Sequence, residues 1–564
     1  MINSYGIAPF GATPSIRQTE HFKKFSKKAF FHFGVNTFSD AEWGDGNEPE
    51  KIFAPTQTDV CQWIKTIKDA GFTLAILTVK HHDGFCLWPS EYTQHTIAKS
   101  PYKDGCGDIL REFTDACRKY GIATGVYISP WDRNSEYWGS AEYNAFFNNQ
   151  LTEILSEYGK IDEVWFDGAG SAEADYDWAL WESTIRKLQP DAVIFGSMSA
   201  APYIECRWVG NESGYAGDPH YPTVDISSVE KEIVLELNSG KLGGDSFLIA
   251  EVDTSIRPGW FYHKEQDNFV KSPKQLIDLW FDSVGKSAIM LLNFPPDRRG
   301  LIHETDSKNA IEAHRIISRA LSENYAEGSK VTASSERCTE CGALNIVDPD
   351  FESFYAASDN DKRPVIEITL PQKNTFDTVI LGEVTELGVR VGGFTVEAEI
   401  DGKWQLLADK KSIGFKRALH FSPITTDKVR ITFYDFAATP LIREISFHNF
   451  TLAGYTHEDT NSQFCGDFDI CSNQCAKYEY LDNGILVQLG GLFPYNTIKF
   501  CGNGIDEFEI LAFNGMQYHS VYKGKNPATE ETVHLDKTIF GSYQFKLLTH
   551  RKENSDLNIH VYKL

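Results

Sequence analysis

Short apolar runs alternate with amphipathic helical stretches over residues 1 to about 325 of this chain. The runs are apolar on both faces, which is typical of strands in a parallel sheet covered on both sides. There are eight of them, and eight such strands favour a closed (β/α)8-like barrel. An open doubly wound sheet is the alternative, but its usual glycine-rich phosphate loop is missing after the first run. The runs are Ala29–Val35, Leu74–Val79, Ile122–Ser129, Glu163–Gly168, Ala192–Ser197, Arg207–Gly210, Ser246–Asp253 and Ser287–Asn293.

The pattern changes after about Tyr325, where short alternating strands and turn residues replace the helical periodicity. Residues 326–451 predict an antiparallel β-sandwich, and their segments DGKW and KVRITF resemble the discoidin-like galactose-binding fold. Residues 452–564 repeat the same order in diverged form, which predicts a second sandwich. We therefore expect a multidomain chain, α/β followed by all-β, with a barrel over residues 1–325 and one or two sandwiches. These either bind carbohydrate or support the barrel by packing, and packing is favoured for the second.

The charge of the chain excludes several classes of partner. Its formal net charge is −25, whereas binding nucleic acid requires a basic surface; an anionic membrane surface is disfavoured in the same way. The sequence has no run of about 18 apolar residues that could form a transmembrane helix. Its first residues show no basic region followed by an apolar one, so we expect a cytoplasmic protein, or a secreted or periplasmic one if a leader was removed. We further expect a neutral substrate and a monomer or small homo-oligomer.

The cysteines give little indication of a metal site. Cys338 and Cys341 form a CxxC pair, and Cys465, Cys471 and Cys475 form a looser cluster. A zinc site would need two further ligands at suitable spacing, and we find none in the sequence. We expect catalysis to need no metal and no organic cofactor; a structural calcium ion on a β-sandwich is left open.

Polar and aromatic residues stand where the apolar runs end. Barrel active sites lie at the C-terminal ends of the strands, so these side chains are expected to ring a single mouth. The set contains three histidines, a tryptophan, an arginine and two carboxylates. Its members are His32, His81, His82, Trp131, Asp167, Glu212 and Arg257.

Asp167 and the adjacent pair His81 and His82 carry most of the chemical argument. A lone Asp before Gly-Ala-Gly would be a turn former or a helix cap, but Asp167 follows residues expected to be buried. An unpaired carboxylate there would be costly, which favours a functional role. Adjacent residues on an extended segment point to opposite sides, so the two imidazoles are not both expected in the core. Imidazoles that bind sugar hydroxyls fit better than a metal pair, which usually has more carboxylates or helical i, i+4 spacing.

In order along the chain, the segments FFHFGVNTF, HHDGFCLW, YISPWDRN, EVWFDGAG, RWVGNESGYA and IRPGWFY resemble the α-L-fucosidase family of retaining glycoside hydrolases. They look most like the branch that removes α-1,3/1,4-linked fucose from branched, Lewis-type oligosaccharides, over roughly residues 20 to 300. The resemblance implies an exo-acting enzyme with Asp167 as its nucleophile. It also implies a fucose pocket whose members are His32, Glu42, Trp43, His81, His82, Tyr127 or Trp131, and Trp280, with Arg257 near the mouth.

The same resemblance places the acid/base in an NE-type loop beyond the nucleophile, which is Glu212 in WVGNESGYAGDP. Glu251 and Glu205 are its competitors. Glu251 ends an apolar run and suits a buried structural role, whereas Glu212 lies in a glycine-rich loop. The implied mechanism is a double displacement: Asp167 attacks the anomeric carbon while Glu212 protonates the leaving oxygen, and Glu212 then deprotonates the water that cleaves the intermediate.

Three alternatives stay open at this point. One is a retaining glycosidase that acts on another sugar. A second is a catalytically weak carbohydrate-binding protein with a degenerate barrel. The third is a metal-dependent barrel hydrolase that uses His32, His81, His82 and Asp167.

Overall fold

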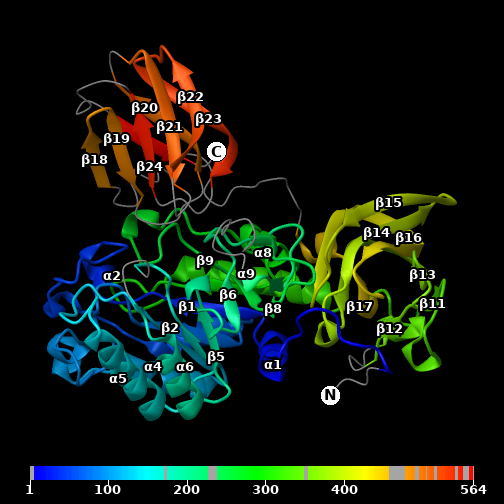
Figure 1. The fold of residues 1–564 in the computed structure, drawn as a ribbon, viewed down its shortest axis with the longest axis horizontal. Coiled ribbons are helices and arrows are strands. Elements are labelled where there is room, and N and C mark those ends of the chain that lie inside the picture. The colour runs from blue at the N-terminus through cyan, green and yellow to red at the C-terminus, as the bar shows by residue number, and fades with distance from the viewer. Residues whose placement is uncertain are drawn as a thin grey trace.

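The fold is given by a computed structural model, in which three parts of the chain can be followed in Figure 1. An α/β barrel forms the N-terminal part, a first β region lies beside it, and a second β region stands above it in this view. The structure describes residues 5–170, 175–226, 238–348, 353–455, 477–489, 495–502, 505–513, 518–539, 544–549 and 558–562.

Eight parallel strands close into a barrel, which confirms the fold predicted from the eight apolar runs. Every residue of the strand Leu74–Lys80 is buried, as expected for a strand covered on both faces. Around the barrel the strands are β1 (Lys27–Phe31), β10 (Ile289–Asn293), β9 (Ile249–Ser255), β6 (Cys206–Trp208), β5 (Val193–Gly196), β4 (Glu163–Trp165), β3 (Ala123–Ile128) and β2 (Leu74–Lys80). A short pair, β7 (Thr223–Val224) and β8 (Ser246–Phe247), precedes β9.

Helices surround the barrel, and residues that favour helix ends stand at both ends of α4. Asp108 caps α4 by accepting a hydrogen bond from the Arg111 amide, and Gly121 ends the same helix with a φ of 69° that favours glycine. The helices are α1 (Ile16–Lys24), α2 (Val35–Ser39), α3 (Val60–Asp69), α4 (Ile109–Tyr120), α5 (Glu142–Glu157), α6 (Trp178–Leu188), α8 (Pro273–Asp282), α9 (Glu304–Leu321) and α10 (Phe450–Ala453).

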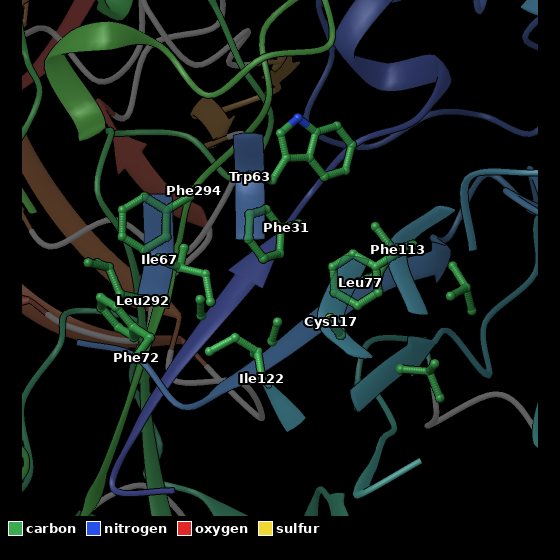
Figure 2. Packing of buried hydrophobic residues seen from close by; sticks show 14 of the residues in the cluster. Phe31, Trp63, Ile67, Phe72, Leu77, Phe113, Cys117, Ile122, Leu292 and Phe294 are labelled. Carbon is green, nitrogen blue, oxygen red and sulfur yellow. The ribbon is translucent and has the colours of Figure 1, made fainter. Parts of the chain in front are cut away.

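The core of the N-terminal part lies between the barrel and these helices (Figure 2). Phe31 of β1 points outward, with its ring centroid 5.7 Å from that of Trp63 on α3 and 5.7 Å from that of Phe113 on α4. Trp63 also donates a hydrogen bond to the Gly300 carbonyl, so its buried indole N–H is satisfied. This packing fixes the ends of the strands, on which the candidate site is built.

The first β region is a seven-stranded antiparallel sheet with its own hydrophobic core. Its two longest strands, β13 and β16, carry register shifts along their pairing. Its strands are β11 (Lys330–Ala333), β12 (Tyr355–Ala356), β13 (Val365–Glu383), β14 (Val391–Ile400), β15 (Lys403–Lys410), β16 (Arg417–Phe436) and β17 (Leu441–His448). It contacts the barrel where the Phe415 amide donates to Ser287 and the His220 amide donates to Ser412.

The second β region has a five-stranded and a three-stranded sheet around a separate core. Phe269, from the barrel segment after β9, packs against that core. The strands are β18 (Lys477–Leu481), β19 (Gly484–Gln488), β20 (Tyr495–Cys501), β21 (Glu507–Phe513), β22 (Tyr518–Lys525), β23 (Glu530–Ile539), β24 (Gln544–Leu548) and β25 (Asn558–Tyr562). These antiparallel sheets agree with the prediction of β-sandwich domains after the barrel.

Three observations concern the cysteines, the possible metal sites and the possible membrane-spanning helices. Cys338 and Cys341 are joined by a disulfide, and Cys465, Cys471 and Cys475 lie outside the described residues. Within the described ranges, no three or more His, Cys, Asp or Glu side chains gather in a way that could hold a metal ion. No helix within the same ranges combines the length and the apolarity needed to cross a membrane.

Candidate active site

The C-terminal ends of the barrel strands bring chemically active side chains to one mouth. His32 follows β1, His81 and His82 follow β2, and Asp167 follows β4. Ring contacts connect them: His32 lies 5.7 Å from His81 and 5.9 Å from Tyr127 of β3, measured between centroids. The tertiary structure therefore gathers four of the predicted substrate-binding residues next to Asp167.

Asp167 is held in a fixed orientation by two donors. The Tyr127 hydroxyl donates to Oδ2 at 2.8 Å, and the Ala169 amide donates to Oδ1 at 2.8 Å. His82 Nε2 lies 3.7 Å from Oδ2, and the Asp167 side chain keeps 25% of its surface exposed. Both donors stabilise the ionised carboxylate, so the group is available as an anionic nucleophile.

The three imidazoles are neutral near pH 7. Burial lowers the pKa of His32 to about 3, and burial also lowers the pKa of His81 and of His82. His32 Nδ1 lies 3.0 Å from the Asn293 side-chain oxygen, which also accepts from the His32 amide. Because that oxygen only accepts, we assign the proton to Nδ1, which leaves Nε2 as an acceptor.

His82 is fixed in the same way. Its Nδ1 lies 2.7 Å from the Ser129 hydroxyl, which donates its own proton to the Trp131 carbonyl. We therefore assign the His82 proton to Nδ1 and an acceptor lone pair to Nε2, beside Asp167. Neutral, oriented imidazoles of this kind suit the recognition of hydroxyl groups.

Two tryptophans form an aromatic wall beside His82. The ring centroid of Trp131 lies 5.0 Å from that of His82, and Trp43 lies 5.8 Å from Trp131. Trp43 is 41% exposed, so part of its side chain is accessible from solvent. Such a wall can cover an apolar face of a sugar.

Glu212 is brought to the mouth by a residue that the sequence analysis did not single out. Trp260, in the loop after β9, donates from Nε1 to Glu212 Oε2 at 3.0 Å. The same indole lies 5.0 Å from the ring of His32, measured between centroids. Glu212 therefore belongs to the same mouth as the histidines. Trp260 stands in the segment IRPGWFY, where its position after a predicted strand is the signal that could have identified it.

Glu42, a predicted sugar ligand, is buried and holds this loop. Its carboxylate accepts from the amides of Trp260 at 2.8 Å and Phe261 at 3.3 Å, and lies 2.6 Å from His263 Nε2. Asp40 binds the other ring nitrogen of His263 at 2.9 Å. These two carboxylates raise the pKa of His263 to about 9 against the opposing effect of burial. Glu42 thus orients Trp260.

Asp253 is a further carboxyl group that the sequence analysis missed. It lies on β9, is 3% exposed, and accepts a hydrogen bond from Trp208 Nε1 at 3.0 Å. Burial raises its pKa well above the usual range, and the charges of Glu212 and Glu251 raise it further. Asp253 is the last residue of a predicted run, so the strand-end rule could have identified it.

The two competitors for the acid/base role are occupied elsewhere. Glu251 is fully buried, contacts Lys28, and accepts from Trp165 Nε1 at 2.7 Å. Glu205 precedes β6 and binds the Ile194 amide and Arg186. Glu251 binds buried groups below the mouth, and Glu205 binds groups nearer the outer surface. Contacts of this kind are those of structural residues.

Arg257 follows β9 at the mouth end of the barrel, but the contacts of its side chain do not support the predicted role as a sugar ligand. Its guanidinium is fully buried and donates to both carboxylate oxygens of Asp306, at 2.7 and 2.9 Å, and to Asp267 at 2.8 Å. It also stacks over Tyr262. Two carboxylates compensate the desolvated charge, so the side chain points away from the substrate.

Trp280 was also assigned wrongly to the sugar pocket. It lies on α8, where its ring centroid is 5.7 Å from that of Phe450. It lines a small cavity together with Lys27 and Phe72. Lys27 begins β1 and Phe72 precedes β2, so this cavity lies at the end of the barrel opposite the mouth. A helical apolar residue packs against neighbouring elements, and nothing in the sequence alone distinguished this from a ligand contact.

Comparisons with known proteins agree with this geometry. The sequence profile of a family described as Alpha-L-fucosidase matches residues 12–313. Alpha-L-fucosidase 1 of Arabidopsis thaliana is 36% identical over 470 residues, which cover 80% of this chain and 90% of that protein.

Two solved structures are similar in fold as well as in sequence. A Bacteroides thetaiotaomicron protein assigned as an α-L-fucosidase is 41% identical with a TM-score of 0.76, and the match covers 79% of this chain and 99% of the other. A Ruminococcus gnavus fucosidase in complex with fucose is 32% identical with a TM-score of 0.74, covering 81% of this chain and 98% of the other.

Proposed function

Given that this chain belongs to the α-L-fucosidase family of glycoside hydrolases, we propose that it is an exo-acting, retaining enzyme for terminal α-1,3/1,4-linked L-fucose on branched, Lewis-type oligosaccharides. The observation that carries this proposal is the convergence of Asp167 and Glu212 on one mouth lined by neutral histidines. Asp167 is oriented by Tyr127, and Glu212 is oriented by Trp260.

In the first step, Asp167 attacks the anomeric carbon as the bond to the leaving sugar breaks through an oxocarbenium-like transition state. Glu212, protonated, transfers its proton to the leaving oxygen, which departs as an alcohol. In the second step, the Glu212 carboxylate removes a proton from water, and the water oxygen displaces Asp167 from the sugar. Asp167 is then an anion again, and Glu212 has regained its proton.

Binding of fucose follows from the walls of the mouth. The neutral nitrogens of His32, His81 and His82 can exchange hydrogen bonds with sugar hydroxyls. Trp43 and Trp131 offer apolar faces for the side of the ring that carries the C5 methyl group. The openness of Trp43 supports a leaving group that extends out of the mouth, as a branched oligosaccharide requires.

The test is fucose release from three substrates: a Lewis-type branched trisaccharide, a 2-linked fucosyl-galactose and an aryl α-L-fucoside. Asp167→Asn serves as the blank, and Asp409→Asn, on an exposed carboxylate of β15, as the matched control. We expect wild type and Asp409→Asn to release fucose from the branched sugar, and Asp167→Asn to lose at least about 10³-fold of that rate. NMR of the first product should show the α-anomer.

Each part of the proposal can fail separately. Equal release from the 2-linked and branched sugars would overturn the linkage preference and leave the fucosidase assignment intact. A β-anomer as first product would overturn the retaining mechanism. Release from none of the three substrates would contradict fucosidase activity itself.

A further inference from the structure

Asp253 lies inside the barrel, on β9 and below the mouth that carries the candidate acid/base. Alternate residues of a strand share a face, and Glu251 of the same strand points inward, because it reaches Lys28 on β1 and Trp165 on β4. Asp253, two residues on, therefore also points inward and lies nearer the C-terminal end of β9. It stands between the buried Glu251 layer and the mouth.

The surroundings of Asp253 provide two neutral donors, its own backbone amide and the Trp208 indole, and no compensating cation. Trp208 on the neighbouring strand β6 donates to Oδ1 at 3.0 Å. Among the described residues, none forms an ion pair with Asp253, and the side chain is 3% exposed. A buried carboxylate with only neutral donors is costly, so this position favours a carboxyl group that holds or shares a proton.

Glu212 is the neighbour with which that proton can be shared. It follows Trp208 by four positions in the loop after β6, and its charge adds to burial in raising the pKa of Asp253. The other charge that acts on Asp253 is that of Glu251, which contacts Lys28 together with Glu163 in the layer below. His32 and Asp167 lie at the mouth above. Lys28 is committed to the two glutamates, and His32 is neutral because its pKa is about 3.

We propose that Asp253 is a positioning residue for Glu212: the two carboxyl groups share one proton in the resting enzyme, and Asp253 keeps that proton available for transfer to the leaving oxygen. This inference rests on the proposed function. Two neighbouring carboxyl groups in a buried site cannot both ionise easily, so the last proton of such a pair is lost only at a raised pH. The acid form of Glu212 thereby persists at a pH where an isolated glutamic acid would be ionised.

The charges of the three carboxyl groups balance over both steps. Before attack, Asp167 carries one negative charge and the Asp253–Glu212 pair carries one. After attack, the ester of Asp167 is neutral, and the pair, having given its proton to the leaving oxygen, carries two. The total of two negative charges is conserved, and the water that cleaves the ester returns the proton to the pair.

The test is the pH profile of kcat/KM for wild type, Asp253→Asn and Asp409→Asn. Asp253→Asn keeps an oxygen for Trp208 and removes the charge beside Glu212. We expect its basic limb to move to lower pH by about one unit or more, because Glu212 then titrates alone. The loss at pH 7 should be larger for the branched trisaccharide than for an aryl fucoside, whose leaving group needs less protonation. The exposed Asp409→Asn should follow wild type.

An Asp253→Asn profile that superimposes on the wild-type profile would overturn the inference. An inactive wild type would instead indicate that the proposed function has failed, so the two failures are distinguishable. Asp253→Glu should restore the position of the basic limb, at least in part, because it restores the carboxyl group.

A second measurement does not depend on the folding of an Asp253 variant. A pKa raised in the folded state makes the unfolding free energy fall as pH rises from the unfolded value of about 3.9 towards the folded one. In Glu212→Gln the neighbouring charge is gone, so this fall should be smaller. We expect Glu212→Gln to gain stability over wild type between pH 4 and 8, measured by thermal unfolding. A constant difference over this range would contradict the shared proton.

Discussion

At the scale of single residues, the side chains of the mouth are oriented by hydrogen bonds within the protein, and the histidines keep a second ring nitrogen for the substrate. His82 gives Nδ1 to Ser129, and His32 gives Nδ1 to Asn293, so their Nε2 atoms face the mouth as acceptors. Tyr127 gives its hydroxyl to Asp167 and stacks against Trp165 at 5.2 Å between centroids. Such engagement removes rotamer freedom before the substrate arrives, which lowers the entropic cost of binding.

Tyr127→Phe should lower kcat about 10- to 100-fold with little change in KM. The variant removes a hydrogen bond to a charged group, which contributes about 1.5–3 kcal/mol, while the ring keeps its packing. The matched control is Tyr158→Phe, which removes a hydroxyl bonded to Asp108 at 2.9 Å, away from the mouth. The measurement is kcat and KM of both variants on an aryl fucoside. Equal kcat for the two variants would mean that Tyr127 does not orient the nucleophile.

Trp260→Phe tests the donor to Glu212. The phenyl ring can keep the contact with His32 but lacks the indole N–H. We expect about a tenfold lower kcat on substrates with poor leaving groups and a smaller loss on activated aryl fucosides. Trp88→Phe removes a similar indole bond to Glu153 at 2.9 Å and serves as the control. A uniform loss across leaving groups would argue against a role in orienting the acid.

At the scale of elements, two loops at the mouth are tied together by buried charge. The loop after β1 supplies Asp40 and Glu42, and the loop after β9 supplies His263 and the backbone of Trp260. Asn293 at the end of β10 adds a hydrogen bond to the Trp260 carbonyl at 2.7 Å. Substrate contact and acid/base orientation therefore depend on the same loop pair.

This pairing predicts a pH dependence of stability. The folded pKa of His263, about 9, lies above its unfolded value of about 6.5. Its contribution is therefore fully present below about pH 6.5 and is lost as the pH rises through about 9. His263→Gln should cost up to about 3 kcal/mol at pH 6 and little at pH 10, as measured by chemical denaturation. His314→Gln is the control, because burial lowers the pKa of His314 to about 4, outside this window. A His263→Gln cost that does not change with pH would contradict the charged clamp.

At the scale of the whole molecule, the two β regions meet the barrel differently. The first region shares hydrogen bonds and an aromatic contact with it, including the Tyr221 hydroxyl to the Lys411 carbonyl at 2.9 Å and Trp280 against Phe450. The second region, which stands above the barrel in Figure 1, receives Phe269 against its core. Phe269 belongs to the segment between β9 and α8 that also carries Trp260. The second β region therefore contacts the same segment that positions Glu212 at the mouth.

Phe269→Ala should weaken the attachment of the second β region. Loss of a partly buried aromatic side chain costs about 1–3 kcal/mol, and calorimetry should show a lower unfolding temperature for that region with the barrel transition unchanged. Phe269→Leu keeps an apolar contact and should recover most of the loss. If both variants unfold like wild type, Phe269 does not hold the second region in place.

The sequence by itself determined the barrel, because runs apolar on both faces and separated by amphipathic helices have few other ways to bury their surface. It also brought His32, His81, His82 and Asp167 to one mouth, since a strand-end position is set by local periodicity. Which side chains turn towards that mouth was decided only by tertiary contacts. Asp306 draws Arg257 away, α10 covers Trp280, and Glu42 brings Trp260 to Glu212. These partners lie far apart along the chain. The local sequence pattern around each residue therefore cannot reveal contacts that form only when the chain has folded.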